Sequence, residues 1–155
     1  DGAGSYGAFA DNKNLSVVVI PDNVTTVGGE AFAGCTSLKT IVFGANVTTL
    51  GAGALRGCTS LAEVSLPKKL TIIPQSCFVG CPALSKVILP EGLTTIERYA
   101  FENCSSLQTI QLPSTIRVMT QAFAGCTGLV ELSARILLLP VQIFPDSWRA
   151  RRPGL

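Results

Sequence analysis

The chain has 155 residues, of which 47% are hydrophobic and only 14% are charged, and its formal net charge is +2. This length and composition predict one domain with a substantial core, exclude general disorder, and give no overall attraction to nucleic acid. No apolar run approaches the roughly 18 residues that a membrane helix needs, and ILLLP at 136–140 is far too short. Histidine is absent, so the commonest general base near neutral pH and the commonest metal ligand are missing.

The first residues form an incomplete unit. Phe9 lies 23 residues before Phe32, and Asn12 stands where later units carry a cysteine. The opening DGAGSYGAF has neither the basic nor the apolar region of a signal peptide, and it lacks an initiating Met. We expect residues 1–14 to be a partial N-terminal turn, either an improvised cap or the cut edge of a longer array, because an uncovered end repeat exposes its core.

The stretch AFAGCTSLKTIVF at 31–43 returns along the chain at a nearly constant interval. Its near-copies are ALRGCTSLAEVSL at 54–66, CFVGCPALSKVIL at 77–89, AFENCSSLQTIQL at 100–112 and AFAGCTGLVEL at 122–132. Steps of 23, 23, 23 and 22 residues separate the cysteines of these copies, which are Cys35, Cys58, Cys81, Cys104 and Cys126. Such a period is typical of a solenoid in which each turn of chain is one unit. Residues 15–144 are therefore predicted to form repeats of about 23 residues within a single domain, 1–155.

Each repeat divides into three parts. In LKTIVF at 38–43, Leu38, Ile41 and Phe43 are predicted to face the core and Thr40 and Val42 the outside, because side chains alternate along a strand. The next part is expected to be a short strand across the back of the turn, at 24–27, 47–50, 70–73, 93–96 and 116–119. The Ala-Phe pair that follows is expected in a compact helical or 3₁₀ turn, which the glycine or asparagine before each cysteine ends with a positive φ.

After Phe144 the chain leaves the repeat pattern. Residues 145–155 are predicted to be a C-terminal cap or tail, in which Trp148 folds over the last turn. Arg149, Arg151 and Arg152 give this segment a small basic character. We interpret them as a solvated terminus, with a contact to an acidic partner or lipid headgroup as the alternative.

The repeat has a recognisable order of residues: C-x-x-L-x-x-I-x-L-P, then L-T-x-I, then A-F-x-x-C. It is clearest in CPALSKVILPEGLTTIERYAFENC at 81–104. This pattern resembles the BspA-type leucine-rich repeat over about residues 8 to 144. The resemblance implies a right-handed α/β solenoid with a parallel sheet on its concave face, and the number of repeats predicts about six turns. It also implies a surface or secreted binding protein, and it transfers no catalytic motif and no ligand residue.

The regular cysteines leave three interpretations open. Stacked strands are roughly 4.8 Å apart, so the five repeat cysteines should form a column. Parallel side chains on successive turns are poorly oriented for a disulfide, and buried free cysteine packs as a small hydrophobe. We favour buried reduced thiols over disulfides and over metal or redox chemistry. There is no C-x-x-C pair, and Cys77 with Cys81 makes a poor metal site without histidine.

The outward positions of the predicted front strands are the candidate ligand-binding site. Solenoids use such sheets as extended binding surfaces. Apolar residues at these positions either mark an interaction site or only reflect how well β-branched residues suit a strand. The candidate residues are Val17, Val19, Thr40, Val42, Glu63, Ser65, Lys86, Ile88, Thr109 and Gln111.

The sequence favours a non-enzymatic protein-interaction or adhesion module with a rigid binding surface. The alternative is a structural or scaffold subunit permanently docked in a larger assembly. Glu97 and Glu102 lack a nearby nucleophile, so no catalytic residue, metal or cofactor is expected. The expected partner is another protein or a glycan, not nucleic acid. The sequence leaves the compartment and the oligomeric state open: the resemblance suggests the cell surface or secretion, and buried free cysteines also fit an intracellular compartment.

Overall fold

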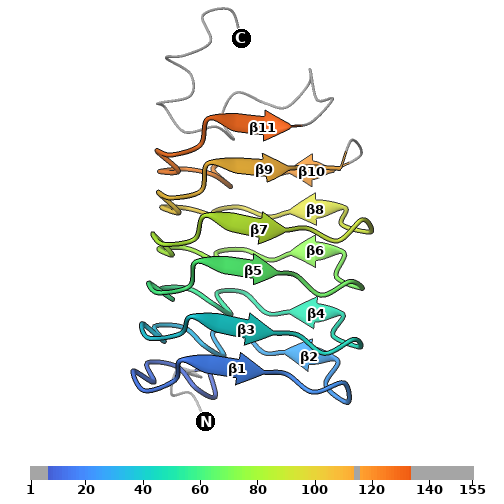
Figure 1. The fold of residues 1–155 in the computed structure, drawn as a ribbon. Helices are drawn as coiled ribbons and strands as arrows, with labels where there is room; N and C mark the ends of the chain where they lie inside the picture. Colours follow the sequence, from blue (N-terminus) through green and yellow to red (C-terminus); the bar gives the residue numbers. More distant parts are fainter. Residues whose placement is uncertain (1–6, 114–115, 134–155) are drawn as a thin grey trace, which may run out of the picture.

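The computed structural model describes residues 7–113 and 116–133, which form a parallel-strand β-solenoid (Figure 1). The chain crosses a front face, returns across a back face, and rises to the next level (Figure 1). Four uninterrupted turns are described, from the first front strand to the fifth, and the next turn is interrupted at residues 114–115.

Short strands occupy both faces of every turn. The front strands are β1 (Val17–Val19), β3 (Thr40–Val42), β5 (Glu63–Ser65), β7 (Lys86–Ile88), β9 (Thr109–Gln111) and β11 (Glu131–Ser133). The back strands are β2 (Thr26–Val27), β4 (Thr49–Leu50), β6 (Ile72–Ile73), β8 (Thr95–Ile96) and β10 (Arg117–Val118). Both sets of strands lie where the sequence predicted them.

All described ladders are parallel and follow the repeat register. On the front, β1 pairs with β3, β5 with β7 and β9 with β11; Val18 lies opposite Ile41 in the first pair. On the back, β2 pairs with β4, while β6, β8 and β10 form one three-stranded ladder. The one-residue contraction before Phe123 leaves the back ladder intact, since Arg117 still pairs with Thr95.

The core fills the space between the two faces. In β3, β5, β7 and β9 the central residue is buried and its two neighbours are exposed, which confirms the predicted alternation. One leucine per turn is fully buried just before each of these strands, at Leu38, Leu61, Leu84 and Leu107. None of the buried side chains among the described residues is polar or charged.

A second column of the core is aromatic. The Phe101 ring stacks on Phe78 with centroids 5.2 Å apart and on Phe123 at 5.4 Å, and Phe9 stacks on Phe32 at 5.4 Å. Leu55, also buried, interrupts the column. Parallel offset rings repeated at the strand spacing couple each turn to the next.

The predicted helical or 3₁₀ turns are wrong for the described residues, which contain strands and turns but no helix. At 30–35 alternate N–H groups take different partners. Those of Ala31, Ala33 and Cys35 bond three residues back, while those of Glu30, Phe32 and Gly34 bond to the carbonyls of Ala52, Ala54 and Arg56 on the next turn. A helix needs every N–H within its own segment. Half of them are used between turns, so the fold is a β-solenoid rather than an α/β one.

Two columns of left-handed residues enforce this arrangement. The predicted positive φ before each repeat cysteine is confirmed, at Gly34, Gly57, Gly80, Asn103 and Gly125, and Asp11, which precedes Asn12 in the same column, shares it. A second column four residues earlier was not predicted and contains Glu30, Gly53, Ser76, Tyr99 and Gln121. A left-handed residue every fourth position breaks a right-handed helical run before it completes two turns.

Several sequence predictions fall outside the described residues. They concern residues 134–144 with Phe144, and the C-terminal cap or tail at 145–155 with Trp148 and its arginines. The full count of six turns extends into this part of the chain and stays a prediction. Nowhere in the described part is there a helix of the length and apolarity needed to span a bilayer.

Candidate binding surface

The ten predicted site residues come together on one surface. All of them are exposed and project from the front face of β1, β3, β5, β7 and β9. The ladder register places Val17 beside Thr40, Val19 beside Val42, Glu63 beside Lys86 and Ser65 beside Ile88. We call these ten residues the front surface.

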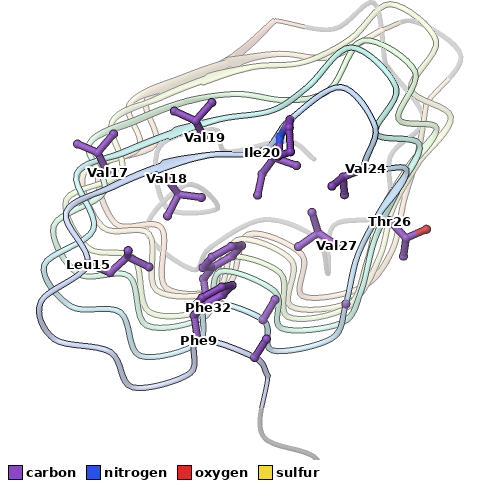
Figure 2. Close-up of a pocket in the computed structure, with 14 residues that line it drawn as sticks. Phe9, Leu15, Val17, Val18, Val19, Ile20, Val24, Thr26, Val27 and Phe32 are labelled. Atoms are coloured by element: carbon purple, nitrogen blue, oxygen red, sulfur yellow. The ribbon is translucent and has the colours of Figure 1, made fainter.

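Its apolar part is well exposed. Val17, Val19, Val42 and Ile88 are 50% to 68% exposed, and three of them lie together on β1 and β3. Figure 2 shows Val17 and Val19 directed away from the ring of chain, whereas Val18 between them points inward. A small apolar area therefore lies at the β1 end of the front surface, and polar side chains follow it along the stack.

The polar part carries one ion pair. Lys86 Nζ lies 3.7 Å from Glu63 Oε2, and both side chains are largely exposed. Such a pair contributes about 0–1 kcal/mol to stability. Both groups are consequently free to exchange this contact for one with a partner.

A groove beside the front surface was missed by the sequence analysis. It has a volume of about 360 Å³ and runs between two successive corners, lined by Ser65, Leu66, Lys68, Ile88, Leu89, Pro90 and Glu91. Ser65 and Ile88 were predicted site residues, while Lys68 and Glu91 were not. The available signal was their position directly after the prolines that follow β5 and β7, Pro67 and Pro90.

The six cysteines are free and buried, as favoured from the sequence. Each repeat cysteine also donates a hydrogen bond that the sequence did not predict. The acceptor is the carbonyl of the Phe-column residue on the preceding turn: Cys81 Sγ lies 3.2 Å from Leu55 O, and Cys104 Sγ lies 3.2 Å from Phe78 O. The column is thus a line of weak donors as well as a packing element.

Burial makes these thiols poor nucleophiles. It raises the pKa of Cys81 and Cys126 to about 12 and also raises the pKa of Cys35, Cys58, Cys77 and Cys104. The thiolate is the reactive and metal-binding form. Among the described residues, no group of three or more His, Cys, Asp or Glu side chains is placed to hold a metal ion.

The carboxylates around the turns have structural contacts. Glu97 Oε2 accepts a hydrogen bond from the backbone N–H of Gln75 at 2.8 Å, and Glu30 lies 3.8 Å from Arg56 Nη1. These contacts fit the solvated polar face that the sequence predicted. They give Glu97 a role in joining two turns.

The β1 end of the solenoid contains an apolar pocket of about 440 Å³ (Figure 2). Its lining includes Phe9, Leu15, Val18, Ile20 and Val24, which occupy the core columns of the first turn. Figure 2 shows these side chains directed into the ring of chain, with Phe9 lying over Phe32. The pocket is therefore lined by the core columns of the first described turn.

Comparison with known protein families identifies one family whose repeats match this chain. The model of the BspA type leucine rich repeat region matches residues 5–130 in six copies. A search of curated protein sequences gives no match.

Three solved structures illustrate the likeness. A leucine rich cell surface protein from Faecalibacterium prausnitzii is 29% identical with a TM-score of 0.74; the match covers 90% of this chain and 36% of that one. A leucine-rich repeat protein from Eubacterium ventriosum is 36% identical with a TM-score of 0.72, covering 87% of this chain and 35% of that one. The T. pallidum leucine rich repeat protein is 25% identical with a TM-score of 0.71, covering 88% and 81%.

This chain therefore spans about a third of the first two of these proteins and most of the third. The repeat order in the sequence, the stacked parallel strands and the family match agree with one another. The chain belongs to the BspA-type leucine-rich-repeat family.

Proposed function

We propose that this chain is a non-enzymatic protein-interaction or adhesion module, and that its front surface contacts the partner. The observation that carries the proposal is the exposed apolar group of Val17, Val19, Val42 and Ile88 on a face that is otherwise polar. Large apolar side chains gathered on one face of a folded domain favour an interaction site.

The scaffold supports this use. Hydrogen bonds and stacked rings join successive turns, so the front surface is already ordered before a partner arrives. Preorganisation lowers the entropic cost of binding. The groove beside Ser65 and Ile88 offers a recess for a side chain of the partner, with Lys68 and Glu91 at its margin.

The proposed partner is another protein, with a glycan as the alternative. Exposure of both apolar and charged groups suits a protein surface, because interfaces combine an apolar centre with a polar rim. A cell-surface location is part of the proposal, in line with the description of the F. prausnitzii protein. The proposal also includes a right-handed coil of the solenoid and a concave curvature of the front face.

The experiment uses the full chain immobilised for affinity capture, followed by binding measurements with each captured protein and with a glycan array. Val42→Glu and Ile88→Glu should each weaken binding of the specific partner by more than tenfold, since each introduces a charge at a desolvated contact. The matched control is Ile72→Glu, because Ile72 is 44% exposed but lies on back strand β6.

Retention of binding in both front variants would contradict the proposal. So would an equal loss in Ile72→Glu, which would move the contact to the back face. Circular dichroism of all three variants checks that the solenoid is folded.

The second candidate function is a structural subunit docked permanently in a larger assembly. The apolar pocket lined by Phe9, Leu15 and Val18 favours it, because obligate interfaces resemble a domain core divided in two. Insolubility of the isolated chain with rescue by a partner would support this function, and a soluble, stable monomer would exclude it.

A further inference from the structure

The corners of the solenoid are not all built alike. Each corner joins a front strand to the back strand of the same turn (Figure 1). Between the first two turns, Asp22 Oδ1 accepts a hydrogen bond from Ala45 N–H at 2.6 Å, and Asn46 Nδ2 donates to Asp22 O at 2.9 Å. Lys69 extends these contacts to the next corner, because its Nζ lies 2.8 Å from Asn46 Oδ1. Side chains therefore bridge the first three corners.

The corners that follow β5 and β7 cannot form the same bridge. Lys68 stands two repeats after Asp22, and its side chain has no oxygen to accept a hydrogen bond. Gly92 stands two repeats after Asn46 and has no side chain to donate one. A Cβ built on Gly92 would meet no atom of the described residues within 4 Å. The groove of about 360 Å³ lies where this bridge is missing.

The groove combines apolar surface with two opposite charges. Its apolar lining comes from Leu66, Ile88, Leu89 and Pro90. Lys68 lines it from one turn and Glu91 from the next, and both residues are exposed. Within residues 7–113 and 116–133, neither of these two charges takes part in an ion pair. An apolar recess with a few polar groups that fix orientation is the usual composition of a binding pocket.

We propose that this groove binds one apolar side chain of an extended segment in a partner protein, with an acidic residue of that segment against Lys68 and a basic residue against Glu91. The inference rests on the proposed function, since Ser65 and Ile88 belong to both the groove and the front surface. Charge complementarity selects a polypeptide, because it can carry an apolar side chain, an acid and a base at fixed spacing. The volume lies near the lower end of the about 300–1,000 Å³ of ligand pockets, which suits one side chain.

An amide NMR titration of the full chain with a capped pentapeptide, Glu-Ser-Leu-Ser-Lys, tests the proposal. Its two charged residues and its leucine share one face when the peptide is extended. We expect the shifts of the amide signals to concentrate at residues 65–68 and 88–92. The control peptide Glu-Ser-Ser-Ser-Lys lacks the apolar side chain and should leave these signals in place.

Gly92→Asn tests the groove itself. An asparagine there can donate to Lys68 O, as Asn46 does to Asp22 O, and its side chain occupies the groove. It should weaken binding of the pentapeptide by at least about tenfold, because the leucine can no longer be buried. The matched control is Gly28→Asn, since Gly28 also has open space at its Cβ position but lies outside the groove.

A charge reversal tests the assignment of the two charges. Lys68→Glu should weaken binding of Glu-Ser-Leu-Ser-Lys about fivefold and favour Lys-Ser-Leu-Ser-Lys instead, because two carboxylates then line the groove. Lys69→Glu makes the same change of net charge one residue further on. Because Lys69 contacts Asn46 and does not line the groove, this control should keep the original preference.

A titration without shifts at the groove would overturn the proposal, and so would shifts that Gly92→Asn leaves unchanged. An unaltered peptide preference in Lys68→Glu would reject the pairing with an acidic residue. Val42→Glu separates these outcomes from the proposed function, since Val42 lies on the front surface outside the groove. If Val42→Glu weakens binding of the captured partner and Gly92→Asn does not, the front surface remains the contact and the groove is excluded.

Discussion

The aromatic column gives the sharpest test of how the turns hold together. Phe101 is fully buried and stacks on a ring above and a ring below, at 5.2 and 5.4 Å. Phe9 occupies the same column but, among the described residues, stacks on Phe32 alone, and it is half exposed. The same substitution at both positions therefore removes different amounts of buried contact.

The expected magnitudes follow from this difference. Replacing a fully buried phenylalanine by alanine costs about 3–5 kcal/mol, so Phe101→Ala should lower the free energy of unfolding by about 4 kcal/mol. Phe9→Ala removes about half the buried area and one ring pair, so it should cost about 1–2 kcal/mol. Phe101→Leu should cost less than about 1.5 kcal/mol, because the column already accepts a buried leucine at Leu55.

Urea unfolding followed by far-UV circular dichroism measures these values. Comparable m-values are required, because partial unfolding of a repeat array would change them. Equal costs for Phe9→Ala and Phe101→Ala would refute the reasoning, since the first turn would then be as well covered as an inner one. If Phe101→Leu lowers the free energy of unfolding as much as Phe101→Ala does, ring stacking rather than burial is the main stabilising contribution of the aromatic column.

Three further predictions concern the backbone, the thiols and the front surface. Gly80→Ala should lower stability by about 1–2 kcal/mol in the same urea assay: a Cβ would meet nothing within 4 Å, so only the left-handed φ of 69° opposes it. Stability should be fully retained below about pH 8.5 and fall as pH rises toward 12, because the unfolded thiols ionise while burial holds the pKa of Cys81 and Cys126 at about 12. Each such thiol lowers the free energy of unfolding by about 1.4 kcal/mol per pH unit in that interval. An unfolding midpoint that stays constant between pH 9 and 11 would contradict this prediction. For the same reason the thiols of the folded protein should resist alkylation at pH 8. Lys86→Ala should change stability by less than about 0.5 kcal/mol, and a larger loss would mean that its exposed pair with Glu63 is structural.

Much of the fold follows from the repeat itself. The strict recurrence of Leu38, Ile41 and their equivalents predicts which side of each front strand faces the core, and the structure confirms it. The positive φ at the glycine column was also predictable, because few residues other than glycine and asparagine tolerate that conformation. Repetition makes each prediction stronger, since every column is sampled several times.

The turns that carry Ala-Phe could not be predicted in the same way. Their length and composition suit a helical turn, and the second left-handed column contains Glu30, Ser76, Tyr99 and Gln121, whose types give no signal for a positive φ. At Glu30 and Ser76 the N–H group bonds to the next turn, to Ala52 O and Arg98 O. That partner lies 22 residues away, outside any local pattern.

The candidate site also has one part that the sequence predicted and another that only the structure revealed. Alternation alone predicted that Val17, Val42 and Ile88 are exposed on one face, and they are. The groove with Lys68 and Glu91 required the stacking of two corners, and the hydrogen bond from each cysteine to the Phe-column carbonyl required the offset between successive turns.

The sequence by itself determined the repeat period, the residues of the core and the side of each front strand that meets solvent, because these depend on spacing within one turn. The tertiary structure alone decided the state of the Ala-Phe turns, the donor role of the cysteines and the exposure of Phe9. Each of these depends on what the neighbouring turn supplies, or fails to supply, to backbone groups and side chains that one repeat cannot satisfy alone.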